Sequence, residues 1–375
     1  MARKKTANME VQKRNHTSVF QILRKSDGLT KQDIVNKLQL CLPTVTQNIN
    51  TLCAQGLVAE CGSIGNTGGR RAKTFGIVKD FRIAIGMDIT RTHVTTVAID
   101  LTGDVIYKNT VHRKFKKGDE YLRYLGQQVE LCVAELQISK EKVLGVGIGI
   151  PALVTADHST VFYGKILNLS DMTCDAFSQY IPFPTLLIND ANAAGFAETW
   201  VSPNIKTAFY LMLSNNIGGS IIMNGQTYNG DHYHSSEVGH ICIERGGRSC
   251  YCGQRGCVDC YLAATELSNM TNGQIADFFK LLESGDAAAG KAFDIYLDNL
   301  AHTANTVFML FDCPVILGGY VGAYIAPYME TIKKRAALLN PFEANADYLH
   351  ECVYRTEAIA AGSALQYVDQ FLSSI

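Results

Sequence analysis

Residues 237–257 read Glu-Val-Gly-His-Ile-Cys-Ile-Glu-Arg-Gly-Gly-Arg-Ser-Cys-Tyr-Cys-Gly-Gln-Arg-Gly-Cys, the most specific pattern of this 375-residue chain. Four of its side chains form a His-x9-Cys-x-Cys-x4-Cys run: His240, Cys250, Cys252 and Cys257. Imidazole and thiolate are the donors that zinc prefers, and the glycines between them allow the tight turns that bring four donors onto one ion. Four protein ligands leave no open coordination position, so the pattern predicts a structural Zn2+ site. A cluster of buried free cysteines is the alternative, because the chain contains 12 cysteines.

The remaining cysteines indicate a reducing compartment. They stand singly along the chain, mostly in apolar segments, and the lysine-rich start does not resemble a signal peptide. No apolar run approaches the roughly 20 residues that span a bilayer, so we expect a soluble, cytoplasmic protein with no membrane partner. A chain of 375 residues that is 47% hydrophobic is better matched by two or three domains than by one.

Charge is distributed unevenly along the chain. Residues 1–82 hold 14 Lys and Arg against 5 Asp and Glu, whereas residues 83–375 hold 20 against 30. A small basic unit attached to a large acidic one indicates that only the first meets a polyanion, for which nucleic acid is the leading candidate. A solvated basic tail is the alternative.

The basic part has the pattern of three short helices around one small core. Apolar residues recur at helical spacing in three sets: Val19, Ile22 and Leu23; Ile34, Val35 and Leu38; Val45, Ile49 and Leu52. In the third helix the core positions leave short hydrogen-bonding side chains outward, namely Thr44, Thr46, Gln47, Asn48 and Asn50. Such side chains suit base edges and phosphates in a major groove.

Two short strands with a glycine-rich basic tip follow, over residues 57–78. Arg70, Arg71 and Lys73 next to Gly68-Gly69 are expected to enter a minor groove or to bind phosphates. Residues 1–82 are therefore predicted to form a winged helix-turn-helix DNA-binding domain. A winged helix used for protein contacts is the alternative.

From residue 83 onward, glycine-punctuated apolar strands alternate with helices, which predicts α/β organisation. A hairpin is expected over 83–100, a helix over 121–136, a buried strand over 143–150, and a strand over 186–190 followed by a helix over 191–198. A second hairpin pattern, over 207–223, echoes the first. Two lobes of similar topology, with a ligand cleft between them, are implied.

Three motifs resemble the signature of the ROK family of repressors, open reading frames and sugar kinases. They are Asn189-Asp-Ala-Asn-Ala-Ala194, Glu237-Val-Gly-His240 and Cys250-Tyr-Cys-Gly-Gln-Arg-Gly-Cys257. The resemblance covers nearly the whole chain, because the winged helix and its Gly68-Gly69-Arg70 wing resemble those of the repressor branch. It implies a two-lobed, actin-like sugar-kinase (ribonuclease H-like) α/β fold, a sugar in the interlobe cleft, and a structural zinc near the sugar.

The phosphate loops distinguish a kinase from a repressor. ROK kinases resemble one another in an Asp-x-Gly-Gly-Thr turn whose glycines let the backbone approach the ATP phosphates. This chain has Asp88-Ile-Thr-Arg-Thr92, and its second loop, Ser214-Asn-Asn-Ile-Gly-Gly219, is only partly glycine. Leu317-Gly-Gly319 resembles the nucleoside-side loop, although a glycine pair is also a common packing device. We expect ATP to bind poorly.

The sugar side keeps more of the family pattern. By resemblance, Asn168, Asn189, Asp190, Glu237 and His240 contact sugar hydroxyls, with the second ring nitrogen of His240 facing the ligand. Two alternatives stay open: Asp190 as a helix cap, and Asn168 as a turn residue.

Two departures from the family pattern affect the ligand. Asp259 is also expected to bind the sugar by resemblance, but it stands where the family commonly has glutamate and is shorter by one methylene. Upstream of Glu237, the usual glycines are replaced by Tyr233 and Ser236. A different sugar, a larger substituent or a lost ligand each fit these changes.

Together these features predict a cytoplasmic, sugar-responsive transcriptional repressor without enzymatic activity, whose partners are a double-stranded DNA operator and a small sugar. The alternative is an ATP-dependent sugar kinase with a fused DNA-binding domain, in which Asp190 is the catalytic base. A homodimer or dimer of dimers is expected, because one short recognition helix reads too few base pairs. The expected domains are 1–82, 83–200 completed by the helix 355–375, and 201–354 with the zinc segment.

Overall fold

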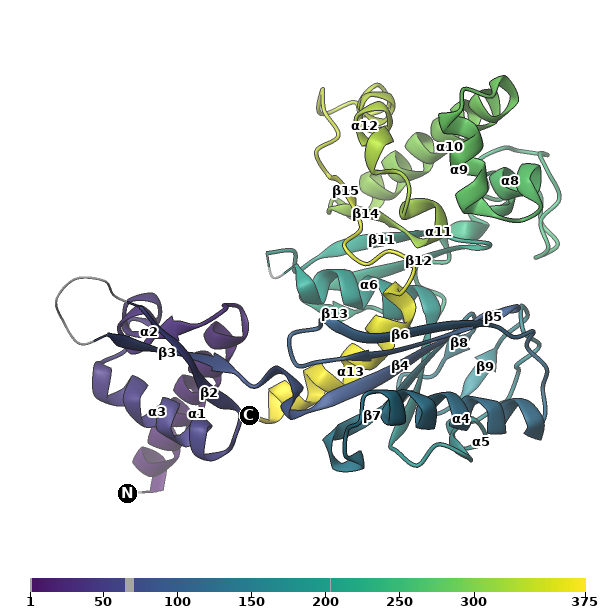
Figure 1. The fold of residues 1–375 in the computed structure, drawn as a ribbon. Coiled ribbons are helices and arrows are strands. Elements are labelled where there is room, and N and C mark those ends of the chain that lie inside the picture. Colours follow the sequence, from purple (N-terminus) through teal and green to yellow (C-terminus); the bar gives the residue numbers. More distant parts are fainter. Residues whose placement is uncertain (1, 65–70, 203) are drawn as a thin grey trace.

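The computed structural model describes residues 2–64, 71–202 and 204–375. A small N-terminal unit stands beside two stacked α/β lobes, and two helices lie between the sheets of these lobes (Figure 1). Within the described ranges, no helix is both long and apolar enough to cross a membrane.

The N-terminal unit contains three helices and a three-stranded antiparallel sheet of order β1-β3-β2. Its elements are α1 (Ala2–Arg24), β1 (Leu29–Thr30), α2 (Lys31–Leu38), α3 (Leu42–Ala54), β2 (Val58–Ile64) and β3 (Ala72–Ile77). Thr30 and Asp33 form a capping box that starts α2, and Gln39 ends it in the left-handed region with φ of 54°. The fully buried side chains of the three helices are Val19, Phe20, Leu23, Ile34, Val45, Ile49 and Leu52.

The first lobe is built on a mixed five-stranded sheet of order β10-β7-β4-β5-β6. Its strands are β4 (Ile83–Ile89), β5 (His93–Ile99), β6 (Val105–His112), β7 (Val143–Ile150) and β10 (Thr185–Asn189). The lobe also contains α4 (Asp119–Glu135), the short hairpin β8 (Leu153–Val154) and β9 (Val161–Tyr163), and α5 (Cys174–Ser178). Because β4, β7 and β10 run parallel, their carboxyl ends meet at one edge of the sheet, facing the second lobe.

The second lobe repeats this plan with a sheet of order β13-β12-β11-β14-β15. Its strands are β11 (Ala208–Leu213), β12 (Ile217–Met223), β13 (Gln226–Thr227), β14 (Val315–Gly318) and β15 (Leu349–Glu351). Its helices are α7 (Asp259–Leu262), α8 (Thr265–Ser268), α9 (Ile275–Glu283), α10 (Ala287–Phe311), α11 (Gly319–Gly322) and α12 (Met329–Ala337).

Helices α6 (Asp190–Val201) and α13 (Ala358–Ser374) lie between the two sheets and cross each other closely (Figure 1). A Cβ added at Gly362 of α13 would lie 1.8 Å from the carbonyl oxygen of Ala193 in α6. Another added at Gly86 of β4 would lie 1.8 Å from the carbonyl oxygen of Ala360. The C-terminal helix therefore packs on the first sheet and on α6, with glycines at its closest contacts. We call α6 and α13 the hinge helices.

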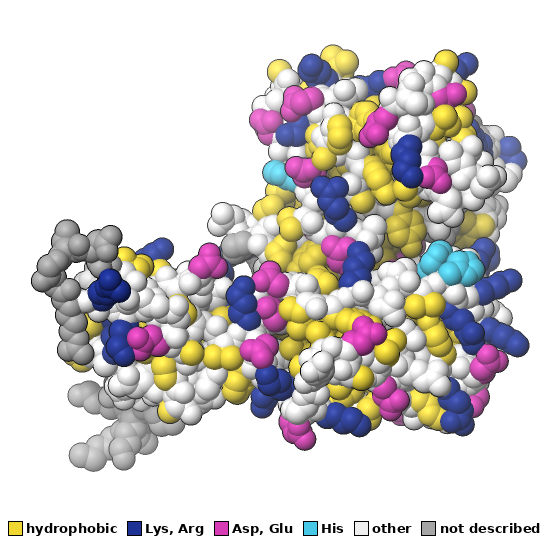
Figure 2. Space-filling view, viewed as in Figure 1, with side chains coloured by type: hydrophobic (Ala, Val, Ile, Leu, Met, Phe, Trp, Pro, Cys, Tyr) yellow, Lys and Arg dark blue, Asp and Glu magenta, His cyan; other side chains and the backbone are white. Residues whose placement is uncertain are grey.

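The N-terminal unit is attached to the two hinge helices. In the space-filling view it projects sideways from the stacked lobes (Figure 2). The Arg24 guanidinium stacks 4.3 Å from the ring centre of Trp200 in α6, and the rings of Phe81 and Phe371 lie 6.3 Å apart. The apolar core of the unit is continuous with the core around α6 and α13. A change in the crossing of the hinge helices would therefore move residues that contact the N-terminal unit.

Candidate functional site

The four predicted metal ligands lie together in the structure. One donor atom from each of His240, Cys250, Cys252 and Cys257 lies within 4.8 Å of the other three. The Sγ atoms of Cys252 and Cys257 are 3.8 Å apart, and His240 Nδ1 is 3.8 Å from Cys250 Sγ. Two thiolates bound at about 2.3 Å to a tetrahedral zinc ion are separated by roughly 3.8 Å. The donor set and its spacing therefore fit a tetrahedral metal ion.

The second ring nitrogen of His240 is directed away from the cysteines. His240 Nε2 lies 3.3 Å from the hydroxyl of Tyr251, a residue between two of the cysteines. If Nδ1 binds a metal, Nε2 carries the proton and donates to this hydroxyl. The cluster of His240, Cys250, Cys252 and Cys257, which we call the His/Cys cluster, therefore places two polar groups at the interlobe cleft. They are the second ring nitrogen of His240 and the hydroxyl of Tyr251.

The cleft contains an inner cavity of about 110 Å³, which opens into a larger one of about 500 Å³ beside the β4–β5 turn. Four residues expected to bind sugar line the inner cavity: Asn189, Asp190, Glu237 and His240. Lys165 and Tyr251 line both cavities.

Asn189 and Asp190 stand at the junction of β10 and α6. Asn189 caps α6 by accepting from the Asn192 amide at 3.0 Å, and its own amide donates to the Ala152 carbonyl and to Asp190. Asp190 accepts from the Ala191 amide at 2.9 Å. The helix-capping role is therefore filled chiefly by Asn189, and the carboxylate of Asp190 also lines the cavity.

Two residues expected to contact the sugar do not line either cavity of the cleft. Asn168 is exposed and has a φ of 55°, so it is a turn residue, the alternative that the sequence left open. Asp259 is buried, and its carboxylate accepts from the Ile217 amide at 2.7 Å. Asp259 therefore holds the start of β12.

Each of the three loops that resemble phosphate loops has a backbone amide engaged by the chain itself. In the β4–β5 turn, Thr90 Oγ1 accepts from the amides of Thr92 and His93 at 3.3 and 2.9 Å. In the β11–β12 turn the Ile217 amide donates to a carboxylate, and at the third loop the Gly319 amide donates to the Tyr210 hydroxyl at 3.1 Å. These amides are not free to bind a phosphate oxygen.

A second carboxylate, Asp88, lies buried at the end of β4 near Asp190. Asp88 is 4% exposed, and its Oδ1 has no hydrogen-bond partner in the described structure. Burial, and then the charge of Asp190, raise the pKa of Asp88 to about 8. Burial, and then the charge of Glu237, raise the pKa of Asp190 to about 7. The proton of this pair therefore resides first on Asp88, and Asp190 is the member that more readily stays ionised and accepts hydrogen bonds.

The raised pKa of Asp88 makes the stability of the protein depend on pH. Its ordinary value is 3.8 and its folded value is about 8, so the folded state binds this proton more tightly than the unfolded state. That stabilising contribution is complete below about pH 4 and is lost as the pH rises through about 8. Asp88→Asn should therefore raise the free energy of unfolding by at least about 1.4 kcal/mol at mildly alkaline pH, relative to its effect at mildly acidic pH. Urea denaturation at both pH values measures this difference, and parallel pH profiles for the two proteins would contradict it.

Two non-glycine residues before Glu237 have a backbone geometry that favours glycine. Tyr233 and Ser236 have φ values of 58° and 66°, in the left-handed region. A side chain with this backbone geometry is strained by about 1 kcal/mol. The ring of Tyr233 lies 5.5 Å from that of Phe162 in β9, so the segment before Glu237 contacts the first lobe through this side chain.

On the N-terminal unit, α3 presents part of the expected polar face. A shallow surface groove runs along it, lined by Leu42, Pro43, Thr46, Gln47, Asn50, Thr51 and Ala54. Asn48 was predicted to face outward with the polar residues of this helix, but its side chain is turned toward α1. It donates to the Thr44 carbonyl and lies 3.2 Å from His16 Nδ1, while Thr44 itself is bound to the Cys41 thiol.

The wing is described in part. Arg71 is exposed, whereas Arg70 lies outside the described residues. The Lys73 ammonium pairs with Glu60 across the β2–β3 hairpin at 2.6 Å, so part of its charge is already compensated.

Two cleft residues, Lys165 and Tyr251, were not predicted from the sequence. Tyr251 stands between Cys250 and Cys252 in the sequence, and that position alone was a signal that it lies beside the predicted metal ligands. Lys165 Nζ donates to the Tyr251 carbonyl at 2.9 Å, a contact between distant segments that no local pattern predicts.

Comparison with known proteins agrees with this geometry. The model of the ROK family matches residues 84–366. The xylose repressor of Bacillus spizizenii is 26% identical over 308 residues, which are 79% of this chain and 80% of that protein. The glucokinase of Halalkalibacterium halodurans is 24% identical over 266 residues, which are 68% of this chain and 77% of that protein. Among solved structures, a ROK family transcriptional regulator described as a homologue of the E. coli MLC protein superposes with a TM-score of 0.72 at 18% identity, covering 97% of this chain and 98% of that one.

Proposed function

We propose that this chain, which belongs to the ROK family, is a sugar-responsive transcriptional repressor. The observation that carries the proposal is the attachment of a helical unit with an exposed polar helix, α3, to the hinge helices of a sugar-type cleft. The name of the xylose repressor, which this chain resembles over most of its length, supports the same function.

The N-terminal unit is a winged helix-turn-helix in this proposal. Helix α3 enters the major groove of an operator, and the β2–β3 wing contacts phosphates or a minor groove through Arg71. Thr46, Gln47 and Asn50 line the outer groove of α3 and are the base-reading candidates. Because one such helix reads few base pairs, the protein acts as a dimer or a dimer of dimers.

Sugar binding controls DNA binding through the lobes. A sugar in the inner cavity is held by Asn189, Asp190 and Glu237, with His240 oriented by a structural zinc ion. It binds most tightly to one arrangement of the lobes and so shifts the crossing of the hinge helices toward that arrangement. The N-terminal units of the dimer then take a spacing that no longer fits the operator. The functional units are 1–82, 83–200 completed by 355–375, and 201–354.

Selected DNA should reveal the role of Gln47. From a random duplex library the full-length protein should select an inverted repeat, and Gln47→Ala should weaken binding to it by about tenfold, the loss of one base contact. Arg71→Ala should weaken binding to all duplexes and lower the slope of log K against log salt concentration by about 0.9. Fluorescence anisotropy at several salt concentrations measures both effects.

Gln32→Ala is the matched control, because Gln32 is an exposed glutamine of α2 in the same unit. It should leave the affinity unchanged. Equal affinities of Gln47→Ala and the wild type would remove α3 from the groove, and binding with no salt dependence would favour a protein-binding winged helix.

We further propose that the chain has lost phosphoryl transfer. The engaged amides at the three loops, together with the side chains of Thr90 and Arg91 in place of glycines, support this. Incubation with Mg-ATP and a panel of hexoses and pentoses should give no sugar phosphate above the level of Asp190→Asn. Sugar phosphate formation that disappears in Asp190→Asn would instead establish the kinase, with Asp190 as its base.

A further inference from the structure

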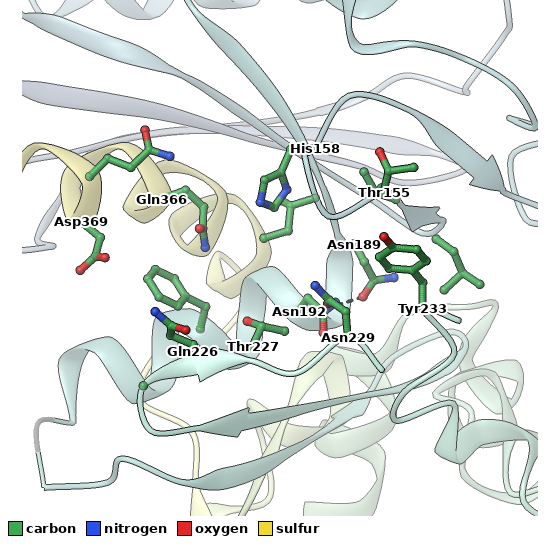
Figure 3. A pocket seen from close by; sticks show the side chains of 16 residues that line it. Thr155, His158, Asn189, Asn192, Gln226, Thr227, Asn229, Tyr233, Gln366 and Asp369 are labelled. Atoms are coloured by element: carbon green, nitrogen blue, oxygen red, sulfur yellow. Dashed lines mark hydrogen bonds between the residues drawn. The ribbon is translucent and has the colours of Figure 1, made fainter. Parts of the chain in front are cut away.

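A further cavity, distinct from the two in the interlobe cleft, lies along the hinge helices, on the other side of Asn189 from the four-residue His/Cys cluster. Its volume is about 260 Å³, and we call it the hinge cavity. Figure 3 shows His158 from the first lobe, Gln226 and Thr227 from β13 of the second lobe, and Gln366 and Asp369 from α13 around the same space. A ligand there would touch both lobes and a hinge helix at once.

The lining of the hinge cavity has the chemistry of a site for a neutral, hydroxyl-rich molecule. Amide and hydroxyl side chains dominate it, and in the described structure those of Gln226, Thr227 and Gln366 make no hydrogen bond. Side-chain amides offer both donors and acceptors, as a sugar or polyol does. Phe196 adds an apolar surface for the C–H face of a ring. Asp369 is the one carboxylate among the lining residues and would disfavour an anion.

One hydrogen bond already joins the walls of the hinge cavity. Asn192 of α6 donates to Asn229 of the second lobe at 3.0 Å, at the end nearest Asn189 (Figure 3). On the first-lobe side, His158 Nδ1 lies 2.8 Å from the Leu187 carbonyl of β10, which directs the opposite edge of the ring away from that strand. The two lobes therefore present positioned polar groups to one space.

The far end of the hinge cavity is connected to the N-terminal unit. Asp369 accepts from the indole N–H of Trp200 at 3.1 Å, and Arg24 at the end of α1 stacks on that indole. Residues of α1 just before Arg24 pack against α3 in one buried core. A hydroxyl that competes for Asp369 would disturb this contact directly.

We propose that the hinge cavity binds a neutral sugar or polyol, separately from the inner cavity, and that this ligand acts on the N-terminal unit through Asp369, Trp200 and Arg24. The ligand supplies hydroxyl donors to Asp369 and takes hydrogen bonds from the amides of Gln226 and Gln366. It would hold the lobes in one relative position, as a second control beside the inner cavity.

Trp200 is the single tryptophan of the chain, so all of the tryptophan emission comes from the residue that contacts Asp369 and Arg24. The full-length protein is titrated with glycerol, sorbitol, xylose, glucose, N-acetylglucosamine and maltose while Trp200 emission is recorded. At least one of these should give a saturable change in emission. Thr227→Phe, which fills the cavity from β13, should abolish it, and Gln366→Leu, which removes an amide without adding bulk, should weaken the apparent affinity about tenfold.

Asp190→Asn disables the inner cavity and should leave the emission change in place. The proposal is overturned if none of the six compounds gives a saturable change, if the change survives both Thr227→Phe and Gln366→Leu, or if Asp190→Asn removes it. Circular dichroism confirms that each variant is folded. Because the readout is Trp200 and not DNA binding, failure of this proposal is distinguishable from failure of the proposed repressor function.

Discussion

Replacing Cys252 by serine should release the metal ion and lower the Tm by at least about 5 °C. Structural zinc sites contribute to folding directly, because the ion binds the folded arrangement of its ligands and stabilises it. In this chain the ion would hold a glycine-rich segment with little other regular structure, residues 241–258. A stability loss of a few kcal/mol corresponds to a Tm change of this size, at about 2 to 4 °C per kcal/mol for a domain of about 200 residues. Metal analysis and a thermal melt on the same preparation measure both effects.

Cys242→Ser is the control for this experiment. Cys242 lies in the same segment and is exposed, but it stands outside the four-residue cluster. It should keep one zinc ion per chain and the wild-type Tm. Full zinc content together with an unchanged Tm in Cys252→Ser would show that Cys252 is not a ligand and would remove the predicted four-residue site.

Gly362→Ala should destabilise the protein by about 3 kcal/mol. The added methyl would stand 1.8 Å from the carbonyl oxygen of Ala193, a backbone atom that cannot move away without displacing α6. The two hinge helices would have to separate, which also moves Asn189 and Asp190 at the start of α6. We therefore expect weaker sugar binding in addition to the lower stability. Urea denaturation followed by circular dichroism measures the free energy of unfolding.

Gly290→Ala provides the matched substitution at an uncrowded site. Gly290 lies in α10, and a Cβ there would have no heavy atom within 4 Å. Because alanine favours a helix over glycine, this variant should gain up to about 1 kcal/mol. If Gly362→Ala were as stable as the wild type, α6 and α13 would not approach each other as closely at Gly362 as the structure shows.

The two largest effects concern different supports of the same cleft. The His/Cys cluster positions His240 and Tyr251 on the second-lobe side of the cleft. The crossing of α6 and α13 positions Asp190 at the start of α6. A sugar bound between them would depend on both supports. The N-terminal unit is attached to the hinge helices through Arg24. A change in the crossing of these helices is therefore also the way in which ligand binding would affect DNA binding.

Much of the site was predictable because its signals are local in sequence. The metal ligands lie within eighteen residues, and their spacing alone predicted a cluster that the structure brings within 4.8 Å. The capping box at Thr30 and the junction of β10 with α6 likewise depend on neighbouring residues. Thr90 and Arg91, in place of the glycines of the phosphate-loop pattern, indicated poor phosphate binding. Only the structure showed that the Thr90 hydroxyl accepts hydrogen bonds from the amides of Thr92 and His93 in this turn.

Residue types and short-range spacing were enough to predict the family, the metal donor set, the unequal charge of the two parts and the main hairpins of the two lobes. Which polar side chains face a ligand or DNA depends on long-range packing. Asn168 and Asp259 were expected in the cleft, but Asn168 stands in a left-handed turn and Asp259 accepts a hydrogen bond from the Ile217 amide. Asn48 was expected to face DNA, but its side chain lies beside His16 of α1. The hinge cavity likewise forms from residues up to 217 positions apart, Leu153 and Gln370. Such long-range contacts arise only when the lobes pack together, and no local pattern encodes them.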